Sequence, residues 1–155
     1  MALIYYVTQV QFDFGAIRLL QQECERVGIS RPLIVTDVGV KAAGVLQKAL
    51  DALPGLPVAV FDQTPSNPTE AAVRAATAIY KAQGCDGLIA VGGGSSIDCA
   101  KGVAIAATHE GPLIHYATIE GGSPRISARA APLIAVPTTS GTGSEVARGA
   151  IIIVD

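Results

Sequence analysis

Charged residues are scarce in this sequence, and charge of one sign does not gather along it. Only 15% of the 155 residues are Asp, Glu, Lys or Arg, against about 25% in an average soluble domain. The net charge is −2, without basic clusters, so we expect neither nucleic acid nor an anionic membrane as a partner. The scarcity of charge instead predicts additional buried surface, such as an interface with another domain or, in a homo-oligomer, with another subunit.

Long apolar runs and cysteine pairs are missing as well. No run approaches the roughly 18 residues of a membrane span, and the stretch 1–6 lacks the basic residues that open a signal peptide. Cys24, Cys85 and Cys99 are odd in number and do not have the spacing of metal ligands. We therefore expect buried, reduced thiols in a cytoplasmic protein.

The two common nucleotide-binding fingerprints are absent, but a different glycine motif is present. The sequence has neither Gly-x-Gly-x-x-Gly nor Gly-x-x-x-x-Gly-Lys-Ser/Thr. Instead, the glycines 92–94 stand between the apolar run 87–91 and a helical pattern that begins at Ser95. A strand, a glycine turn and a helix N-terminus together favour phosphate binding, although the glycines also suit a tight turn alone. Ser95 as N-cap and Asp98 three residues later predict a capping box.

Apolar runs that predict strands alternate with helical patterns along the chain. The expected strands are 9–14, 32–37, 57–62, 87–91, 132–137 and 150–154, and the expected helices are 17–27, about 40–53, 67–83 and one from residue 95. Asn67 is the expected N-cap of the third helix, with Pro68 at its first position and Glu70 completing a capping box. This order predicts an α/β domain over 1–155 with a doubly wound, mainly parallel sheet, Rossmann-like in class. The stretch 109–131 has no sustained periodicity, and we expect a functional loop there.

Polar residues follow four of the expected strands. Because the carboxyl ends of parallel strands share one edge, we expect Asp37, Asn67, the 92–95 turn and the 138–144 stretch to meet there. Asp37 can accept hydrogen bonds from ribose hydroxyls or simply start a helix, and Asn67 can cap a helix or face a ligand. The 138–144 stretch holds several hydroxyls, and Thr142 with Glu145 predicts a further capping box.

Two motifs resemble those of the iron-containing alcohol dehydrogenase family. They are Gly-Gly-Gly-Ser-x-x-Asp-x-x-Lys at 92–101 and Pro-Thr-Thr-Ser-Gly-Thr-Gly-Ser-Glu at 137–145, supported by Asn-Pro-Thr at 67–69. The resemblance implies an NAD-dependent oxidoreductase that acts on a small-molecule alcohol or aldehyde, with NADP left open as the cofactor. Carried over by position, it implies that the pyrophosphate binds at Gly93, Gly94 and Ser95, the adenosine ribose at Asp37, and the rest of the cofactor at Asn67, Asp98, Thr138, Thr139 and Thr142. Lys101 has no ligand by this resemblance, and a salt link to Asp98 is its expected role.

The metal site of the family is not expected in this chain. The resemblance implies Fe²⁺ or another divalent metal held by one Asp and three His of a helical C-terminal domain, and the chain ends at Asp155. His109 and His115 match none of those ligands, so no metal ligand and no catalytic residue is assigned. We expect a truncated, cofactor-binding half that is inactive by itself.

Other functions remain open from the sequence. A relative of the same fold is one alternative, such as glycerol dehydrogenase, dehydroquinate synthase or maleylacetate reductase. Ser95 argues against glycerol dehydrogenase, where the resemblance implies a Lys. A nucleotide-binding module without catalysis is the alternative from another class.

Overall fold

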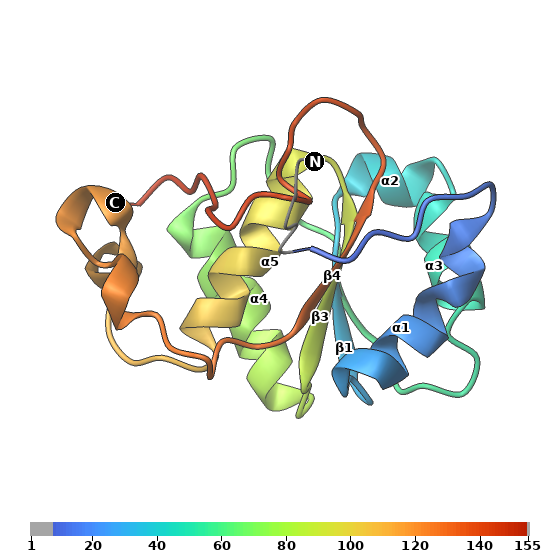
Figure 1. Ribbon diagram of the computed structural model, residues 1–155, viewed down its shortest axis with the longest axis horizontal. Helices are drawn as coiled ribbons and strands as arrows, with labels where there is room; N and C mark the ends of the chain where they lie inside the picture. The colour runs from blue at the N-terminus through green and yellow to red at the C-terminus, as the bar shows by residue number, and fades with distance from the viewer. Residues whose placement is uncertain (1–7, 155) are drawn as a thin grey trace, which may run out of the picture.

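The computed structural model describes residues 8–154, and its centre is a four-stranded parallel sheet (Figure 1). The strand order is β2-β1-β3-β4, and each neighbouring pair is parallel. The central strands β1 and β3 are buried along their whole length, as expected for a parallel sheet covered on both faces. The strands are β1 Pro32–Val35, β2 Ala59–Phe61, β3 Gly87–Gly92 and β4 Leu133–Pro137.

Helices cover both faces of this sheet, which confirms the doubly wound α/β fold. In Figure 1, α4 and α5 lie on one side of the strands and α1 to α3 on the other. Successive side chains of β1 alternate between the two layers: Leu33 and Val35 pack in the core under α4 and α5, and Ile34 in the core under α1 and α3. The helices are α1 Leu20–Val27, α2 Val38–Ala42, α3 Val45–Asp51, α4 Glu70–Ala82 and α5 Gly94–Ala106.

The helix expected over 40–53 is two helices. Gly44 separates α2 from α3 with a φ of 74°, a left-handed conformation that glycine adopts without steric cost. The apolar periodicity continues across this break, so the sequence alone did not reveal it. α2 begins at Val38, shortly after β1 ends at Val35.

The expected cap of α4 is wrong by two residues. The N-cap is Thr69, whose side-chain oxygen accepts a hydrogen bond from the Ala72 amide at 3.2 Å. Asn67 and Pro68 precede the helix, and Glu70 pairs with Arg74 instead of completing a box. This shift leaves the Asn67 side chain free of a capping role.

Two expected strands are wrong. Residues 9–14 form no strand, and their alternation reflects an exposed approach to a 3₁₀ turn, Ala16–Leu19, with Phe12 98% exposed. In 150–154, only Ile153 makes a bridge, and its partner is Thr69 at the start of α4 rather than the sheet. Of this segment, Ile152 contacts the hydrophobic core under α4 and α5, whereas Ile151 and Ile153 are exposed.

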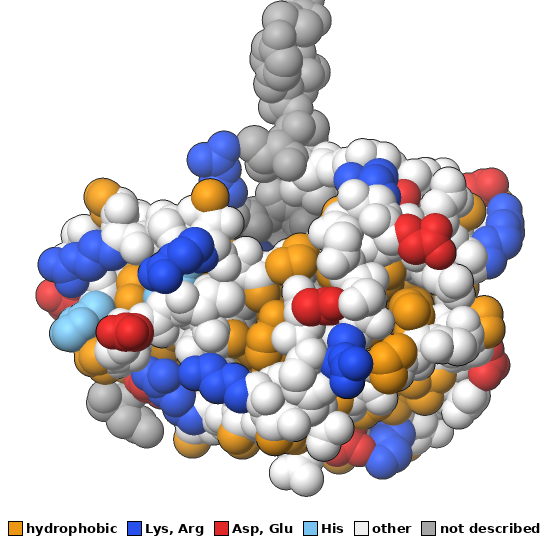
Figure 2. Space-filling model, turned by 90° about the horizontal axis from the view of Figure 1, so that it is seen from below, with side chains coloured by type: hydrophobic (Ala, Val, Ile, Leu, Met, Phe, Trp, Pro, Cys, Tyr) orange, Lys and Arg blue, Asp and Glu red, His pale blue; other side chains and the backbone are white. Residues whose placement is uncertain are grey.

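The long 109–131 stretch is a loop, as expected, with 3₁₀ turns at Leu113–Tyr116, Thr118–Glu120 and Ser123–Arg125. On the face at the amino ends of the strands, acidic and basic side chains are interspersed (Figure 2). Among the described residues, no helix is both long and apolar enough to cross a membrane. All three cysteines are free and buried, as predicted.

Candidate functional site

The carboxyl ends of the strands border an open groove that contains most of the residues selected from the sequence. Its volume is about 670 Å³. The segments around it are the start of α2, the 64–66 loop, the glycine turn before α5 and the end of β4. The expected residues that line it are Asp37, Gly93, Gly94, Ser95, Thr138 and Thr139.

The N-terminus of α5 opens into this groove. The helix is 13 residues long, its N-cap is Gly93, and no side chain caps it. The capping box expected from Ser95 and Asp98 is therefore wrong, because the helix already begins at Gly94. The first hydrogen bond along the helix runs from the Ile97 amide to the Gly93 carbonyl at 3.2 Å. The amides that precede it point out of the helix end, where an anion binds best.

The glycines of the turn allow the 138–144 stretch to approach. Gly92 has a φ of 155°, and a Cβ there would lie 2.4 Å from the Ser96 hydroxyl. A Cβ on Gly93 would lie 3.0 Å from the Thr139 hydroxyl, and one on Gly94 3.1 Å from the Ser144 hydroxyl. Close packing against the 138–144 stretch thus accounts for Gly93 and Gly94, whereas Gly92 is confined by Ser96 of α5.

The loop 138–143, called the threonine loop below, is anchored to the sheet at its first residue. The Thr138 amide donates to the Gly92 carbonyl at 2.9 Å, which extends the pairing of β3 with β4. Thr142 does not start a helix as expected, and its hydroxyl accepts from the Ser144 amide at 3.4 Å instead. Thr142 lies against Gly94: a Cβ added to Gly94 would be 3.3 Å from the Cβ of Thr142.

The Ser95 hydroxyl is already hydrogen-bonded within the protein. It donates to the Ser66 carbonyl and so ties the 64–66 loop to the first turn of α5. A hydroxyl has one proton to donate. In this arrangement Ser95 therefore offers an anion its backbone amide and keeps its hydroxyl for the loop.

Asp37 starts a helix, which is one of the two roles considered for it, and it also lines the groove. It is the N-cap of α2, and its Oδ1 accepts from the Val40 amide at 2.9 Å. Its Oδ2 accepts from the Ser96 hydroxyl at 3.2 Å. A carboxylate accepts about four hydrogen bonds, so acceptor capacity remains toward the groove that Asp37 lines.

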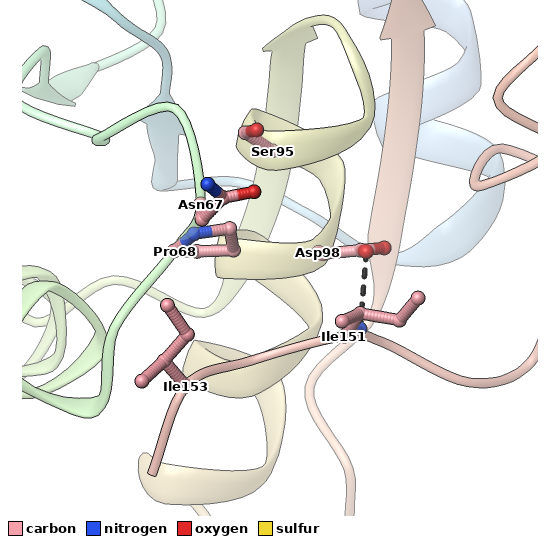
Figure 3. A pocket seen from close by; sticks show the side chains of 6 residues that line it. All are labelled: Asn67, Pro68, Ser95, Asp98, Ile151 and Ile153. Carbon is pink, nitrogen blue, oxygen red and sulfur yellow. Dashed lines mark hydrogen bonds between the residues drawn. The ribbon is translucent and has the colours of Figure 1, made fainter. Parts of the chain in front are cut away.

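A smaller cavity of about 270 Å³ lies beside the groove and shares Ser95 with it. Figure 3 shows Asn67 and Pro68 on one side of this cavity, with Ser95 and Asp98 on α5 across from them. Asp98 is 8% exposed, and its Oδ2 accepts from the Ile151 amide at 3.0 Å. The carboxylate is therefore held by a backbone amide while it lines the cavity. Ile151 and Ile153 complete the lining.

The sequence assigned no ligand to Lys101, and in the structure its side chain binds three backbone carbonyls. Its Nζ donates to the carbonyls of Ser144, Ala147 and Gly149 at 2.6, 2.8 and 2.7 Å. The expected ion pair with Asp98 is present but longer, at 3.9 Å. Burial lowers the pKa of the Lys101 amine, against the attraction of nearby carboxylates.

The two histidines serve the long loop. The Ser127 amide donates to Nε2 of His109 at 3.0 Å, so Nδ1 carries the proton and donates to the Thr108 hydroxyl at 2.8 Å. His109 also packs edge-on against Tyr116 at 5.4 Å between ring centres. His115 is exposed. Within 8–154, no three His, Cys, Asp or Glu side chains gather in a way that could hold a metal, so the described residues do not fit the iron of the resemblance.

Comparison with known protein families agrees with the motifs. Residues 8–155 match the sequence model of a family described as iron-containing alcohol dehydrogenase. A 4-hydroxybutyrate dehydrogenase from Cupriavidus necator is 74% identical over 155 residues, which are 100% of this chain and 41% of that protein. The chain therefore spans about two-fifths of the length of this curated relative.

Solved structures share the fold. A 1,3-propanediol oxidoreductase superposes with a TM-score of 0.78 at 35% identity, over 90% of this chain and 42% of that one. A sulfoacetaldehyde reductase from Bifidobacterium kashiwanohense, solved in complex with NAD⁺, superposes with a TM-score of 0.80 at 27% identity. That match covers 100% of this chain and 46% of the other.

Proposed function

The chain belongs to the iron-containing alcohol dehydrogenase family, and on that premise we propose that residues 1–155 are its NAD-binding domain. The whole protein then transfers a hydride between an alcohol carbon and the nicotinamide. In this proposal, residues of the whole protein other than 1–155 hold the divalent metal of that reaction. The described residues supply the binding and orientation of the cofactor.

One observation carries this proposal: an uncapped helix N-terminus opens into the groove at the carboxyl edge of a parallel sheet. This edge is where open α/β sheets bind their ligands. The opposite sides of the groove carry a carboxylate, Asp37, and hydroxyls, Thr138 and Thr139. A ligand that matches all three features has an anionic centre with polar groups on both sides, as a dinucleotide has.

The residues divide the cofactor between them. The amides at the start of α5, including those of Gly94 and Ser95, bind the pyrophosphate through the positive end of the helix dipole. Asp37 accepts from the adenosine ribose hydroxyls, and the negative charge of its carboxylate disfavours a 2′-phosphate. The hydroxyls of Thr138, Thr139 and Thr142 donate to the second ribose and to the carboxamide of the nicotinamide. Asn67 and Asp98 border the nicotinamide end of the cofactor. When bound, the nicotinamide supplies the hydride acceptor.

For the substrate, we propose a short primary alcohol that carries a carboxylate. The relative that is 74% identical is named for 4-hydroxybutyrate, whereas a structural neighbour at 35% identity is named for 1,3-propanediol. The higher identity favours the hydroxy acid. The proposed substrate class follows from the name of this relative.

Calorimetry and kinetics on the whole protein, with the residues that hold the metal in this proposal, test it. We expect saturable binding of NAD, and NADH formation that is faster with 4-hydroxybutyrate than with 1,3-propanediol. Absence of NAD binding contradicts the function altogether. Binding without turnover of any alcohol or aldehyde identifies a nucleotide-binding module instead. Faster oxidation of the diol contradicts the substrate class only.

A further inference from the structure

Lys101 lines neither cavity, yet its ammonium group is fully engaged. The side chain is 14% exposed and extends from the middle of α5 to the 144–149 segment. An ammonium group has three protons to donate, and three carbonyls of this segment accept them within 2.6–2.8 Å. The whole donor capacity of Lys101 is therefore used to hold one stretch of backbone.

Asp98, one turn earlier on α5, holds the same stretch by an acceptor. Its Oδ2 binds the Ile151 amide, and its Oδ1 lies 3.9 Å from the Lys101 Nζ. We refer to this pair, Asp98 and Lys101, as the α5 clasp. Burial lowers the pKa of the Lys101 amine, and the nearby carboxylates of Asp98 and Glu145 oppose that shift.

The clasp fixes the far end of the threonine loop. The near end is fixed at Thr138 by the sheet, while Gly141 and Gly143 between the anchors have φ values of 97° and 69° and open space around them. Glycines at these positions leave the loop free to take other conformations. Where Thr139 and Thr142 lie against the glycine turn therefore depends on both anchors.

An apolar side chain at position 101 would fill the same space, but it would donate no hydrogen bond to the three carbonyls. Ala147 and Gly149 are exposed and Ser144 is half-buried, so without a donor at position 101 their carbonyls bind water and the segment is free to move outward. A charged donor between three carbonyls instead defines one position of the backbone.

We propose that Lys101 is a positioning residue for the cofactor: through the α5 clasp it holds the threonine loop against the glycine turn. This inference rests on the proposed function, because it takes the loop to bind NAD. Lys101 itself touches neither cofactor nor substrate. Its effect on NAD passes through the backbone of 144–149.

Limited proteolysis and calorimetry on the purified protein test this role. Arg148 is exposed and stands between two of the carbonyls that Lys101 binds, so the bond after Arg148 is a trypsin site within the clasped segment. For Lys101→Met, we expect cleavage after Arg148 to accelerate about tenfold and the Kd for NAD to rise about tenfold. Lys101→Arg keeps a charged donor and restores both to within about threefold of the unsubstituted protein.

A control on the same helix separates this role from general stability. Val103 is buried in the core beneath α5, so Val103→Ala lowers the melting temperature without changing Arg148 cleavage or the Kd for NAD. If Lys101→Met does not fold, Lys101→Gln gives the same test, because its amide is too short to reach the three carbonyls. Faster cleavage with an unchanged Kd, or no change in either, overturns the positioning role. If the unsubstituted protein does not bind NAD, the proposed function fails and the cofactor role of Lys101 fails with it.

Discussion

At the scale of single residues, Gly94 is needed for contact rather than for its backbone conformation. It has helical geometry, and the constraint comes from Thr142 and Ser144, whose side chains occupy the space a Cβ would need. A larger residue there displaces the threonine loop, whereas only Gly92 of the three needs a left-handed φ. The two glycines therefore tolerate different changes.

We predict that Gly94→Val weakens NAD binding about tenfold or more, or about 1.4 kcal/mol. The valine pushes Thr142 and Ser144 away from the turn and narrows the approach of the pyrophosphate. Calorimetry measures the affinity, with circular dichroism to confirm the fold. Ala78→Val, an exposed substitution on α4 away from the groove, is the control. An unchanged affinity in Gly94→Val removes the turn from the site.

We predict that Asp37→Asn raises the preference for NADP over NAD, measured as the ratio of kcat/KM values. The substitution removes the charge that repels a 2′-phosphate but keeps an oxygen able to cap α2. Asp51→Asn, an exposed position at the end of α3, removes the same charge elsewhere and leaves the ratio unchanged. An unsubstituted protein that already prefers NADP contradicts the role of Asp37.

At the scale of elements, the long loop is held together by contacts of a histidine. His109 accepts from the backbone of Ser127 and so fastens residues of the loop that are distant in sequence. Its ring also contacts Tyr116. Both nitrogens have partners within the protein.

We predict that His109→Phe lowers the free energy of unfolding by about 1–3 kcal/mol, because the Ser127 amide loses its acceptor. The phenyl ring keeps the packing against Tyr116. Urea unfolding measures the change, and His115→Phe, an exposed substitution in the same loop, leaves stability unaltered. Loss of bound metal in His109→Phe would place a metal ligand in this loop, against the assignment made here.

Elements that are buried on both faces were predictable from the sequence, and their ends were not. The continuous apolar runs of β1 and β3 predict buried strands, because both faces of these strands are covered. The start of α4 depends on Ile153, whose carbonyl accepts from the Glu70 amide at 2.8 Å. A backbone group distant in sequence cannot be predicted from the local residues, so the sequence predicted Asn67 as the N-cap.

The same reason explains what was missed at the site. Residues of the groove follow strands and carry recognisable side chains, so the motifs selected them. The partners of Lys101 are carbonyls, which every residue has, and no spacing of side chains indicates them. The cofactor roles themselves remain predictions for the experiments above.

At the scale of the whole molecule, two buried thiols link stability to alkaline pH. Burial raises the pKa of the Cys24 thiol and of the Cys99 thiol from 9.0 to about 11. The unfolded chain ionises these thiols first, so their contribution to stability is complete below pH 9 and is lost as the pH rises toward 11. Neutral pH leaves both protonated.

We predict that the free energy of unfolding falls between pH 9 and pH 11, and that it falls less steeply in a Cys24→Ala, Cys99→Ala double variant. Urea unfolding at several pH values gives both slopes, and their difference isolates the thiols from Tyr80, whose pKa burial also raises. Parallel slopes for the two proteins would contradict the raised pKa values.

The bridge between Thr69 and Ile153 has a consequence for the order in which the segments of this domain pack together during synthesis. Strands β1 to β3 and helices α4 and α5 emerge from the ribosome before Ile153 does, and they already contain most of the sheet. The Glu70 amide and the Pro68 carbonyl find their partners only when Ile153 arrives, after the threonine loop and the segment that Lys101 holds. Residues 8–154 therefore form their core strands first, and the segment around Ile153 docks at the start of α4 only afterwards.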